Sequence, residues 1–180
     1  MNFVLEFNQV MRKNEELRLI SNVDPLTGVF NRRILEELDL SIYSMLIAID
    51  MDNLKYYNDS YGHQEGDALL TLLANTARQN LRQTDLIIRT GGDEFILLLK
   101  DVNLPEAENI ILRIRQQFIR AVLDERIDFS YGIVSIQDSL EITMRKADEK
   151  MYQMKRARKN LVLVADSGNK PAYNRSRQPG

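Results

Sequence analysis

Two adjacent glycines stand between two short apolar runs and predict a β-hairpin in the middle of the chain. Leu86–Ile88 precede the glycine pair Gly91-Gly92, and Phe95–Leu99 follow it. Apolar runs joined through such a pair are typical of two antiparallel strands. Asp93 and Glu94 follow the turn directly; glycines let a backbone approach a ligand closely, and carboxylates beside them suit a divalent metal on a phosphate. A glycine turn with two solvated acids is the alternative.

The other apolar patterns predict helices and strands that alternate along the chain. We expect helices over 31–40, 53–57, 66–81, 106–122 and 139–156, and strands over 43–49, 129–136 and 161–164. In the helix over 66–81, Leu69, Leu70, Leu72 and Leu73 are expected to face inward. With the hairpin, the order βααββαβαβ implies an α/β (α+β) fold in which helices flank a mixed central sheet.

Three segments divide the chain. Residues 1–21 place Phe3, Phe7, Val10, Asn14 and Leu17 at alternating spacings of four and three, which predicts an amphipathic helix that pairs with a partner or lies on the domain. Residues 22–165 form the predicted folded domain, and the polar tail 166–180 is predicted to be disordered. Because the chain starts within a stub of helix, we expect a sensory domain upstream.

The composition excludes several classes of protein. Charge is nearly balanced, with 24 basic and 26 acidic residues, which argues against a general nucleic-acid binder. There is no cysteine, so thiolate nucleophiles and cysteine metal sites are excluded. The longest apolar stretch is far below the ~18 residues of a membrane span. We therefore expect a cytoplasmic protein without a membrane segment.

Two acids end the first long predicted strand. Asp50 and Asp52 flank Met51, and residues two apart on a strand face the same way. We expect Asp52 to cap the following helix through its side chain, whereas Asp50 is a candidate metal ligand. If the hairpin lies beside this strand, Asp50 joins Asp93 and Glu94 in an oxygen-rich cluster suited to Mg²⁺ or Mn²⁺. Mg²⁺ takes its remaining ligands from water and phosphates, so a nucleoside triphosphate is the natural guest.

Further polar side chains could contact such a nucleotide. An Asn and an Asp together can read the edge of a guanine, and the run 55–67 supplies both types, although each is also an ordinary turn residue. His63, the single histidine, is expected to be structural. Lys155 and Lys159 lie on one face of the last long helix, where they could meet terminal phosphates or remain a screened, solvated surface.

Taken together, these runs resemble the GGDEF family of diguanylate cyclases over about residues 22–164. The resemblance rests on Asp24-Pro25-Leu26-Thr27-Gly28 with Asn31-Arg32-Arg33, Asp50-Met51-Asp52 with Lys55, Asn58-Asp59, Gly62-His63, Gly66-Asp67, Gly91-Gly92-Asp93-Glu94-Phe95, Ser130-Tyr131-Gly132, and Ala147-Asp148 with Tyr152 and Lys155. Motifs in this order are not expected by chance. The resemblance implies a largely antiparallel sheet of the nucleotide-cyclase or polymerase-palm type.

The family joins two GTP molecules into cyclic di-GMP and releases two pyrophosphates, and the resemblance assigns roles to individual residues. The implied metal ligands are Asp50, Glu94 and the Met51 carbonyl. Asp93, Glu94 and Lys55 are the implied catalytic residues. The implied substrate contacts are Asn58 and Asp67 with the guanine, and Lys55, Lys155 and Lys159 with phosphates. Gly91 and Gly92 would lie beside the triphosphate. Each domain would carry one GTP, so a homodimer is implied, and the N-terminal helix would hold its two domains together.

A second implied site binds the product. Arg82 and Asp85 precede Gly91 at the spacing of the family's inhibitory RxxD site, where cyclic di-GMP would bind. An exposed ion pair between the two is the alternative. A second arginine from the helix holding Arg113 and Arg115 could complete the site, and the sequence does not choose between them.

The chain departs from the family pattern at several positions. Thr90 stands where an aromatic residue is usual, Asn53 and Leu54 replace more common apolar or aromatic residues, and Arg158-Lys159 replaces the usual Gly-Arg. Lys159 lacks the bidentate fork of arginine, so phosphate binding there is expected to be weaker. None of these changes removes a signature acid, which favours an active, product-inhibited cyclase. The alternatives are a silent domain that binds GTP or cyclic di-GMP, and a dimerisation module with a vestigial metal site.

Overall fold

The structure is a computed structural model that describes residues 11, 13, 21–137 and 139–168. Most of the predicted N-terminal helix over 1–21 therefore lies outside the described residues. The predicted tail lies outside them from residue 169 onward, and its first three residues, 166–168, belong to a helix.

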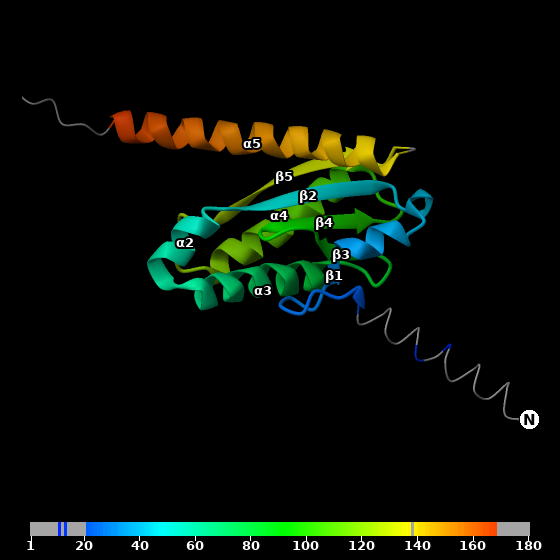
Figure 1. Cartoon of the computed structure of the whole chain (residues 1–180). Helices are drawn as coiled ribbons and strands as arrows, with labels where there is room; N and C mark the ends of the chain where they lie inside the picture. Colours follow the sequence, from blue (N-terminus) through cyan, green and yellow to red (C-terminus); the bar gives the residue numbers. More distant parts are fainter. Residues whose placement is uncertain (1–10, 12, 14–20, 138, 169–180) are drawn as a thin grey trace, which may run out of the picture.

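A five-stranded sheet forms the centre of the domain (Figure 1). Its strands are β1 (Phe30–Asn31), β2 (Met45–Asp52), β3 (Leu86–Arg89), β4 (Glu94–Leu99) and β5 (Asp128–Ser135). Their order in the sheet is β1-β3-β4-β2-β5, with β1 parallel to β3 and every other pair antiparallel. The predicted mixed, largely antiparallel sheet is confirmed, and the hairpin β3–β4 lies beside β2.

Helices cover both faces of this sheet. They are the 3₁₀ helices η1 (Arg32–Glu36) and η2 (Leu40–Ile42) and the α-helices α2 (Leu54–Tyr61), α3 (His63–Asn80), α4 (Leu104–Ala121) and α5 (Leu140–Gly168). Figure 1 shows α5 running along one face, with α3 and α4 on the other. α4 begins with a reciprocal capping box between Asn103 and Glu106 and carries Pro105 in its first turn, which explains its sharp start.

Two sequence expectations about secondary structure are wrong. Residues 161–164 do not form a strand, because α5 continues through them to Gly168. No Gly or Pro interrupts the chain between Lys155 and that glycine, and the strand preference of a short Leu-Val run is weak against an established helix. The expected helix over 31–40 is instead the separate 3₁₀ turns η1 and η2, each begun by a side-chain cap, from Asn31 and Asp39.

Alternate residues of the central strands enter two separate hydrophobic clusters. Ile47 and Ile49 of β2 belong to the cluster beneath α3 and α4. Leu46 and Ala48 belong to the cluster beneath α5 and η1. Because both faces are buried, β2 and β4 are apolar almost throughout, and their polar residues are confined to the strand ends. The signature acids lie at those ends.

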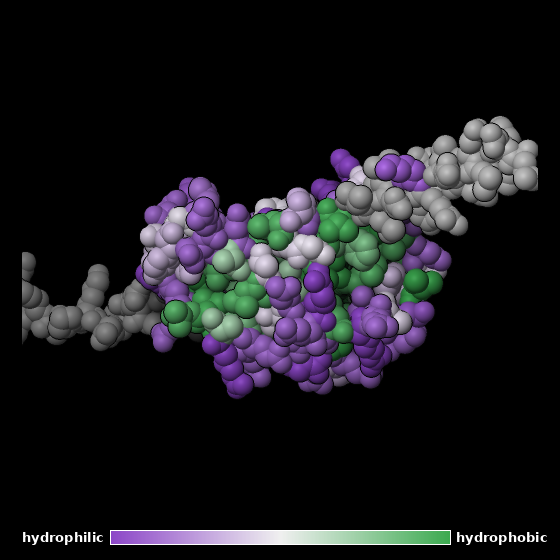
Figure 2. Space-filling view, turned by 90° about the horizontal axis from the view of Figure 1, so that it is seen from below, coloured by the Kyte–Doolittle hydropathy of each residue, from purple (hydrophilic) through white to green (hydrophobic). Residues whose placement is uncertain are grey.

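The outer surface of the α3 side is mixed in character. Figure 2, seen from below, shows hydrophobic residues interspersed with hydrophilic ones over this face. Within the part of the chain that the structure describes, no helix has the length and apolar content needed to cross a membrane.

Candidate functional site

The register of the hairpin places Glu94 directly opposite Asp50. Residues of β2 and β4 pair from Met45 with Leu99 through to Asp50 with Glu94. The pairing continues into the turn, where the Met51 N–H donates to the carbonyl of Asp93 at 3.1 Å. Cross-strand neighbours project from the same face of a sheet. The two carboxylates predicted to share a metal are therefore brought together, on the face that α5 covers.

Arg89 supports the turn of the hairpin from beneath. Its Nη2 donates to the Gly92 carbonyl at 2.7 Å, and its Nη1 donates to Asp24 Oδ1 at 3.0 Å. Asp24 also accepts from the Thr27 backbone N–H and hydroxyl, at 2.9 and 2.6 Å. One arginine thus ties the loop at the start of the domain to the glycine turn.

The two turn glycines are not required by the backbone conformation of the turn itself. Among the described glycines, only Gly28 and Gly62 have a positive φ. A Cβ on Gly91 would lie 2.7 Å from Glu94 Oε2, whereas a Cβ on Gly92 would meet nothing within 4 Å. Gly91 therefore leaves room for the Glu94 carboxylate, and the space above Gly92 is open to a ligand.

Lys155 of α5 reaches Asp50 from the face of the sheet that α5 covers. Its Nζ donates to Asp50 Oδ1 and lies 3.9 Å from Asp52 Oδ1. Partial burial favours the neutral amine, but the hydrogen bond and negative charge of Asp50 outweigh it and raise the pKa of Lys155. Lys155 is therefore a charged ammonium at the carboxylates, where a phosphate would also approach.

Asp52 does not cap α2 as the sequence analysis expected. The capping position is Asn53, which has a left-handed backbone (φ 62°) and no capping side-chain bond. The Asp52 carboxylate remains on the α5 face of β2, where the Ser130 hydroxyl donates to it at 2.9 Å and Arg158 Nη1 donates at 2.7 Å. Burial nevertheless raises the pKa of Asp52, against the opposing effect of these partners.

Arg158 extends these contacts into a chain of ion pairs. It donates to the Phe129 carbonyl at 3.0 Å and pairs with Asp128. Asp128 also accepts two bonds from Arg115 of α4, at 2.9 and 2.6 Å. Arg115, Asp128, Arg158 and Asp52 therefore form an alternating row of arginines and carboxylates that runs from α4 across β5 to the end of β2. This row ties α4 and α5 to the strand ends that carry the site.

The electrostatics of the hairpin fit a divalent cation. Partial burial raises the pKa of Glu94, and the charges of Asp50, Asp93 and Asp148 raise it further. Within the described residues, no group of three or more Asp, Glu, His or Cys side chains is arranged to hold a metal. The expected cluster of three carboxylates, Asp50, Asp93 and Glu94, is therefore not formed, and two carboxylates remain side by side, Asp50 and Glu94. Two carboxylates are compatible with Mg²⁺, which takes few protein ligands.

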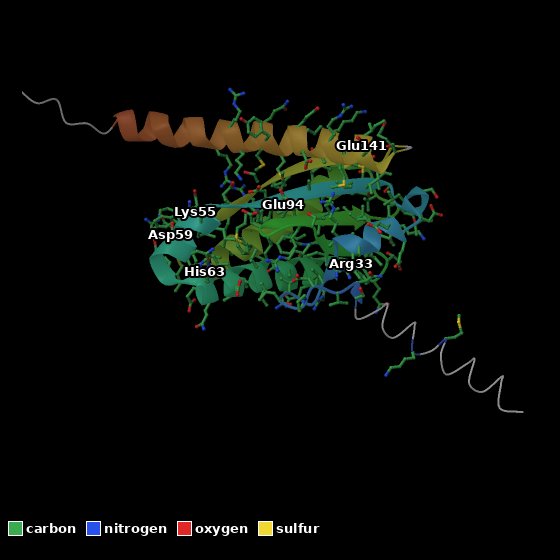
Figure 3. All side chains as sticks on the ribbon, viewed as in Figure 1. Arg33, Lys55, Asp59, His63, Glu94 and Glu141 are labelled. Carbon is green, nitrogen blue, oxygen red and sulfur yellow. The ribbon has the colours of Figure 1, made fainter. Side chains whose placement is uncertain are left out.

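The guanine candidates lie at the junction of α2 and α3. The Asn58 amide is packed against Gly66, since a Cβ there would lie 1.8 Å from Asn58 Oδ1, and Asp67 is the next residue. This buried amide oxygen has no hydrogen-bond partner among the described residues. Figure 3 shows Lys55 and Asp59 on α2 at one end of the molecule, with Glu94 nearer the middle on the α5 side. Lys55 is exposed.

α2 is held in place by the loop before β5. Asn53 Nδ2 donates to the Arg126 carbonyl at 2.7 Å. The Arg126 guanidinium lies over the Tyr56 ring, 4.2 Å from its centroid, and pairs with Asp124 at 2.8 Å. The helix that carries the guanine and phosphate candidates is therefore positioned through polar contacts at its outer side.

Arg82 and Asp85 line a separate cleft of about 460 Å³ between α3 and α4. The expected alternative of an ion pair between their side chains is not found: the Asp85 carboxylate accepts backbone N–H groups of Arg82, at 2.9 Å, and Lys100, at 3.1 Å. Arg113 lines the same cleft and bonds to Asn80, whereas Arg115 bonds to Asp128 elsewhere. Of the two candidate arginines, Arg113 is the one that lines this cleft.

The structure brings some of the predicted residues together and leaves others apart. Glu94 lies opposite Asp50, and Lys155 contacts Asp50. Lys55, Asn58 and Asp67 lie on α2 and α3, and the side chain of Lys159 lies outside the described residues. Sequence reasoning missed the roles of Arg89 and Arg158. For Arg158 the signal was its position three residues after Lys155, on the same face of a helix.

Comparison with known proteins places this geometry in context. A family model described as "Diguanylate cyclase, GGDEF domain" matches residues 21–161. The chain is 39% identical over 152 residues to the probable diguanylate cyclase DgcJ of Escherichia coli, covering 75% of this chain and 31% of the relative. It is 32% identical over 167 residues to the diguanylate cyclase DgcP of Pseudomonas aeruginosa, covering 84% and 25%. The chain thus spans a third or less of the length of these curated relatives.

Solved structures show the same fold. The diguanylate cyclase SiaD of Pseudomonas aeruginosa, solved with its activator SiaC, has a TM-score of 0.69 at 30% identity, covering 87% of this chain and 66% of that one. A microbial GGDEF domain solved with cyclic di-GMP has a TM-score of 0.66 at 30% identity, covering 76% and 94%. The palm-like fold expected from the sequence is confirmed.

Proposed function

We propose a function for this chain from the family to which it belongs, that of the GGDEF-domain diguanylate cyclases. It joins two GTP molecules into cyclic di-GMP. In each of two equivalent steps, the 3′-hydroxyl of one nucleotide attacks the α-phosphorus of the other and gives up its proton to solvent. A P–O bond forms, the bond from the α-phosphorus to the bridging oxygen of the β-phosphate breaks, and pyrophosphate leaves with the electron pair of that bond.

Asp50, Glu94 and the Met51 carbonyl would hold Mg²⁺ or Mn²⁺. When bound, the metal supplies positive charge that offsets the charge developing on the phosphates. Asp93, in the turn beside Glu94, would lie at the attacking hydroxyl or at a second metal ion. Lys155 pairs with Asp50 as a charged ammonium, which supports a role in stabilising the leaving pyrophosphate. Lys55 and Lys159 would be further phosphate contacts.

Asn58 and Asp67 would recognise the guanine. An Asp carboxylate can accept from the guanine N1–H and exocyclic amine. The amide oxygen of Asn58 is buried against Gly66 without a hydrogen-bond partner in the described part of the chain, so the amide would turn outward to meet the base. The N-terminus of α2 lacks a capping side chain, so its first backbone N–H groups remain available to an anion. The phosphate contacts would thus come from the start of α2, and the base contacts from the middle of α2 and from α3.

Two such domains must face each other for the reaction, because each carries one nucleotide. We propose a homodimer held through residues 1–21, which lie mostly outside the described residues. Pairing raises the effective concentration of the second GTP and fixes its orientation.

The observation that carries this proposal is the pairing of Asp50 with Glu94 beneath Lys155. Incubating the chain with GTP and Mg²⁺ should yield cyclic di-GMP, detected by chromatography. Glu94→Gln should remove the product, and Glu141→Gln, at the exposed start of α5, should not (Figure 3). Nucleotide binding without product would instead support the silent-domain alternative, and an active Glu94→Gln variant would contradict the assigned site.

Product inhibition is proposed at the cleft of Arg82, Asp85 and Arg113. Arg82 is exposed and lines the same cleft as Arg113, so its guanidinium would be available to a guanine or phosphate of cyclic di-GMP. Arg113 donates two bonds to Asn80 and would offer its remaining N–H groups. Arg82→Ala and Arg113→Ala should each raise the product concentration needed for half-inhibition while leaving GTP affinity nearly unchanged. The exposed Arg120→Ala is the matched control on α4, and inhibition curves identical to the parent's would refute the assignment.

A further inference from the structure

Arg158 holds a carboxylate that would otherwise compete for Lys155. Asp50 and Asp52 project from the same face of β2, and one ammonium, Lys155 Nζ, lies between them. It contacts Asp50 and is 3.9 Å from Asp52. Arg158 Nη1 donates to Asp52 Oδ2 at 2.7 Å, so Asp52 already has a cation of its own.

Arg158 is itself fixed by other partners. Its remaining contacts are the Phe129 carbonyl, at 3.0 Å, and the Asp128 carboxylate, which Arg115 binds in turn. A planar guanidinium with its donors committed in this way is held in one orientation. Arg158 is therefore not free to bind a phosphate, although it belongs to the basic cluster at the end of the described side chains of α5.

We propose that Arg158 is a positioning residue for the nucleotide: by neutralising Asp52 it keeps Lys155 at Asp50 and available to the triphosphate. Without Arg158, the nearest described cation to Asp52 is Lys155, and a shift of roughly 1 Å would bring that ammonium into contact with it. Lys155 would then be shared between two carboxylates and less available to a phosphate. This inference rests on the proposed function, because it takes Lys155 as a phosphate contact.

A purely structural role for Arg158 predicts something different. Arg158 also fastens α5 to β5, so its loss could weaken GTP binding by loosening the helix. Lys150 provides a matched comparison, because its Nζ donates to the Ile133 carbonyl at 2.8 Å and likewise fastens α5 to β5. Lys150 is not in contact with Asp50 or Asp52 among the described ion pairs, so Lys150→Met loosens the helix without freeing a site carboxylate.

The test is a double-variant cycle of GTP affinity, measured by calorimetry with Mg²⁺ and a non-hydrolysable GTP analogue. Arg158→Met should raise the Kd on the order of tenfold, or about 1.4 kcal/mol. Asp52→Asn in the same chain should restore it to within about threefold, because a neutral amide does not attract Lys155. Arg158→Lys, which keeps the charge but not the fork, should fall between Arg158→Met and the parent, and it serves as the test variant if Arg158→Met does not fold. Lys150→Met should leave the Kd near the parent value.

The outcomes separate this inference from the proposed function. Failure of the parent chain to bind the analogue counts against the function. If the parent binds, the inference is overturned by a double variant that is no tighter than Arg158→Met, or by a Lys150→Met variant weakened to the same extent. Thermal unfolding of each variant, measured in parallel, shows whether a change in Kd follows a change in stability.

Discussion

The variant Gly92→Ala tests whether the glycine at the hairpin turn is needed for ligand binding or for folding. Gly92 is exposed, its φ is not positive, and a Cβ there meets no atom within 4 Å. The nucleotide-free fold therefore has no steric reason for a glycine at this position. If the backbone passes over a triphosphate, the bound state does have such a reason.

Gly92→Ala is expected to change the free energy of unfolding little and the rate of turnover strongly. Gly92→Ala should change the free energy of unfolding by less than about 1 kcal/mol, and a small gain is possible because alanine restricts the unfolded chain. A methyl forced against a bound phosphate costs roughly 1–3 kcal/mol, as overpacking does in a protein core. This corresponds to a loss in kcat/KM of roughly fivefold to 150-fold.

Urea unfolding monitored by circular dichroism measures the first quantity, and initial rates of pyrophosphate release from GTP measure the second. Gly91→Ala is the companion variant, because its Cβ would lie 2.7 Å from Glu94 Oε2 and disturbs a candidate ligand even without nucleotide. It should weaken Mn²⁺ binding to the nucleotide-free protein, whereas Gly92→Ala should not. Full activity in Gly92→Ala would refute the close approach of this backbone to the triphosphate, and unfolding of that variant would refute the open space above it.

Two further predictions concern the scaffold. Gly132→Ala should destabilise the domain by about 2 kcal/mol or more, measured by urea unfolding. The new Cβ would lie 2.0 Å from the Ala147 carbonyl oxygen and 2.7 Å from the Met151 nitrogen, both backbone atoms of α5. A stability equal to the parent's would show that α5 can move away freely. Hydrogen bonds from Arg126 lower the pKa of Asp124 to about 2, so the stabilisation it provides is complete above the ordinary value of 3.8 and disappears as the pH falls toward 2. Thermal midpoints of the parent and Asp124→Asn should therefore differ at pH 6 and converge near pH 2, and a constant difference would exclude this ion pair as the cause.

The sequence predicted the part of the site that depends on local pattern. Two apolar runs around a glycine pair define the hairpin, and side-chain alternation in β2 puts Asp50 and Asp52 on one face. The prediction that the hairpin lies beside β2 was conditional, and the register of Asp50 with Glu94 confirms it. A local pattern suffices here because an acid at the end of an apolar strand is unfavourable unless it has a partner.

The remaining features depend on contacts between distant segments. The partner of Asp52 is Arg158, 106 positions away, and no spacing rule connects them. Arg113 and Arg115 are both on α4, and only the packing of that helix shows that one faces the cleft of Arg82 while the other faces β5. The length of α5 was missed because a short Leu-Val run satisfies the local preference of a strand even when a helix already runs through it.

The two ends of the site differ in how firmly the scaffold holds them. Asp50 and Glu94 extend from strands with both faces buried, whereas within α2, all of which the structure describes, no side chain is buried. The free energy of local opening should therefore be lower at α2 than at β2 and β4, and the backbone amides of α2 should exchange with solvent faster. The acids at the strand ends therefore keep their spacing whether or not a ligand is present, whereas the spacing between these acids and α2 depends on the few polar contacts that α2 makes with the loop before β5.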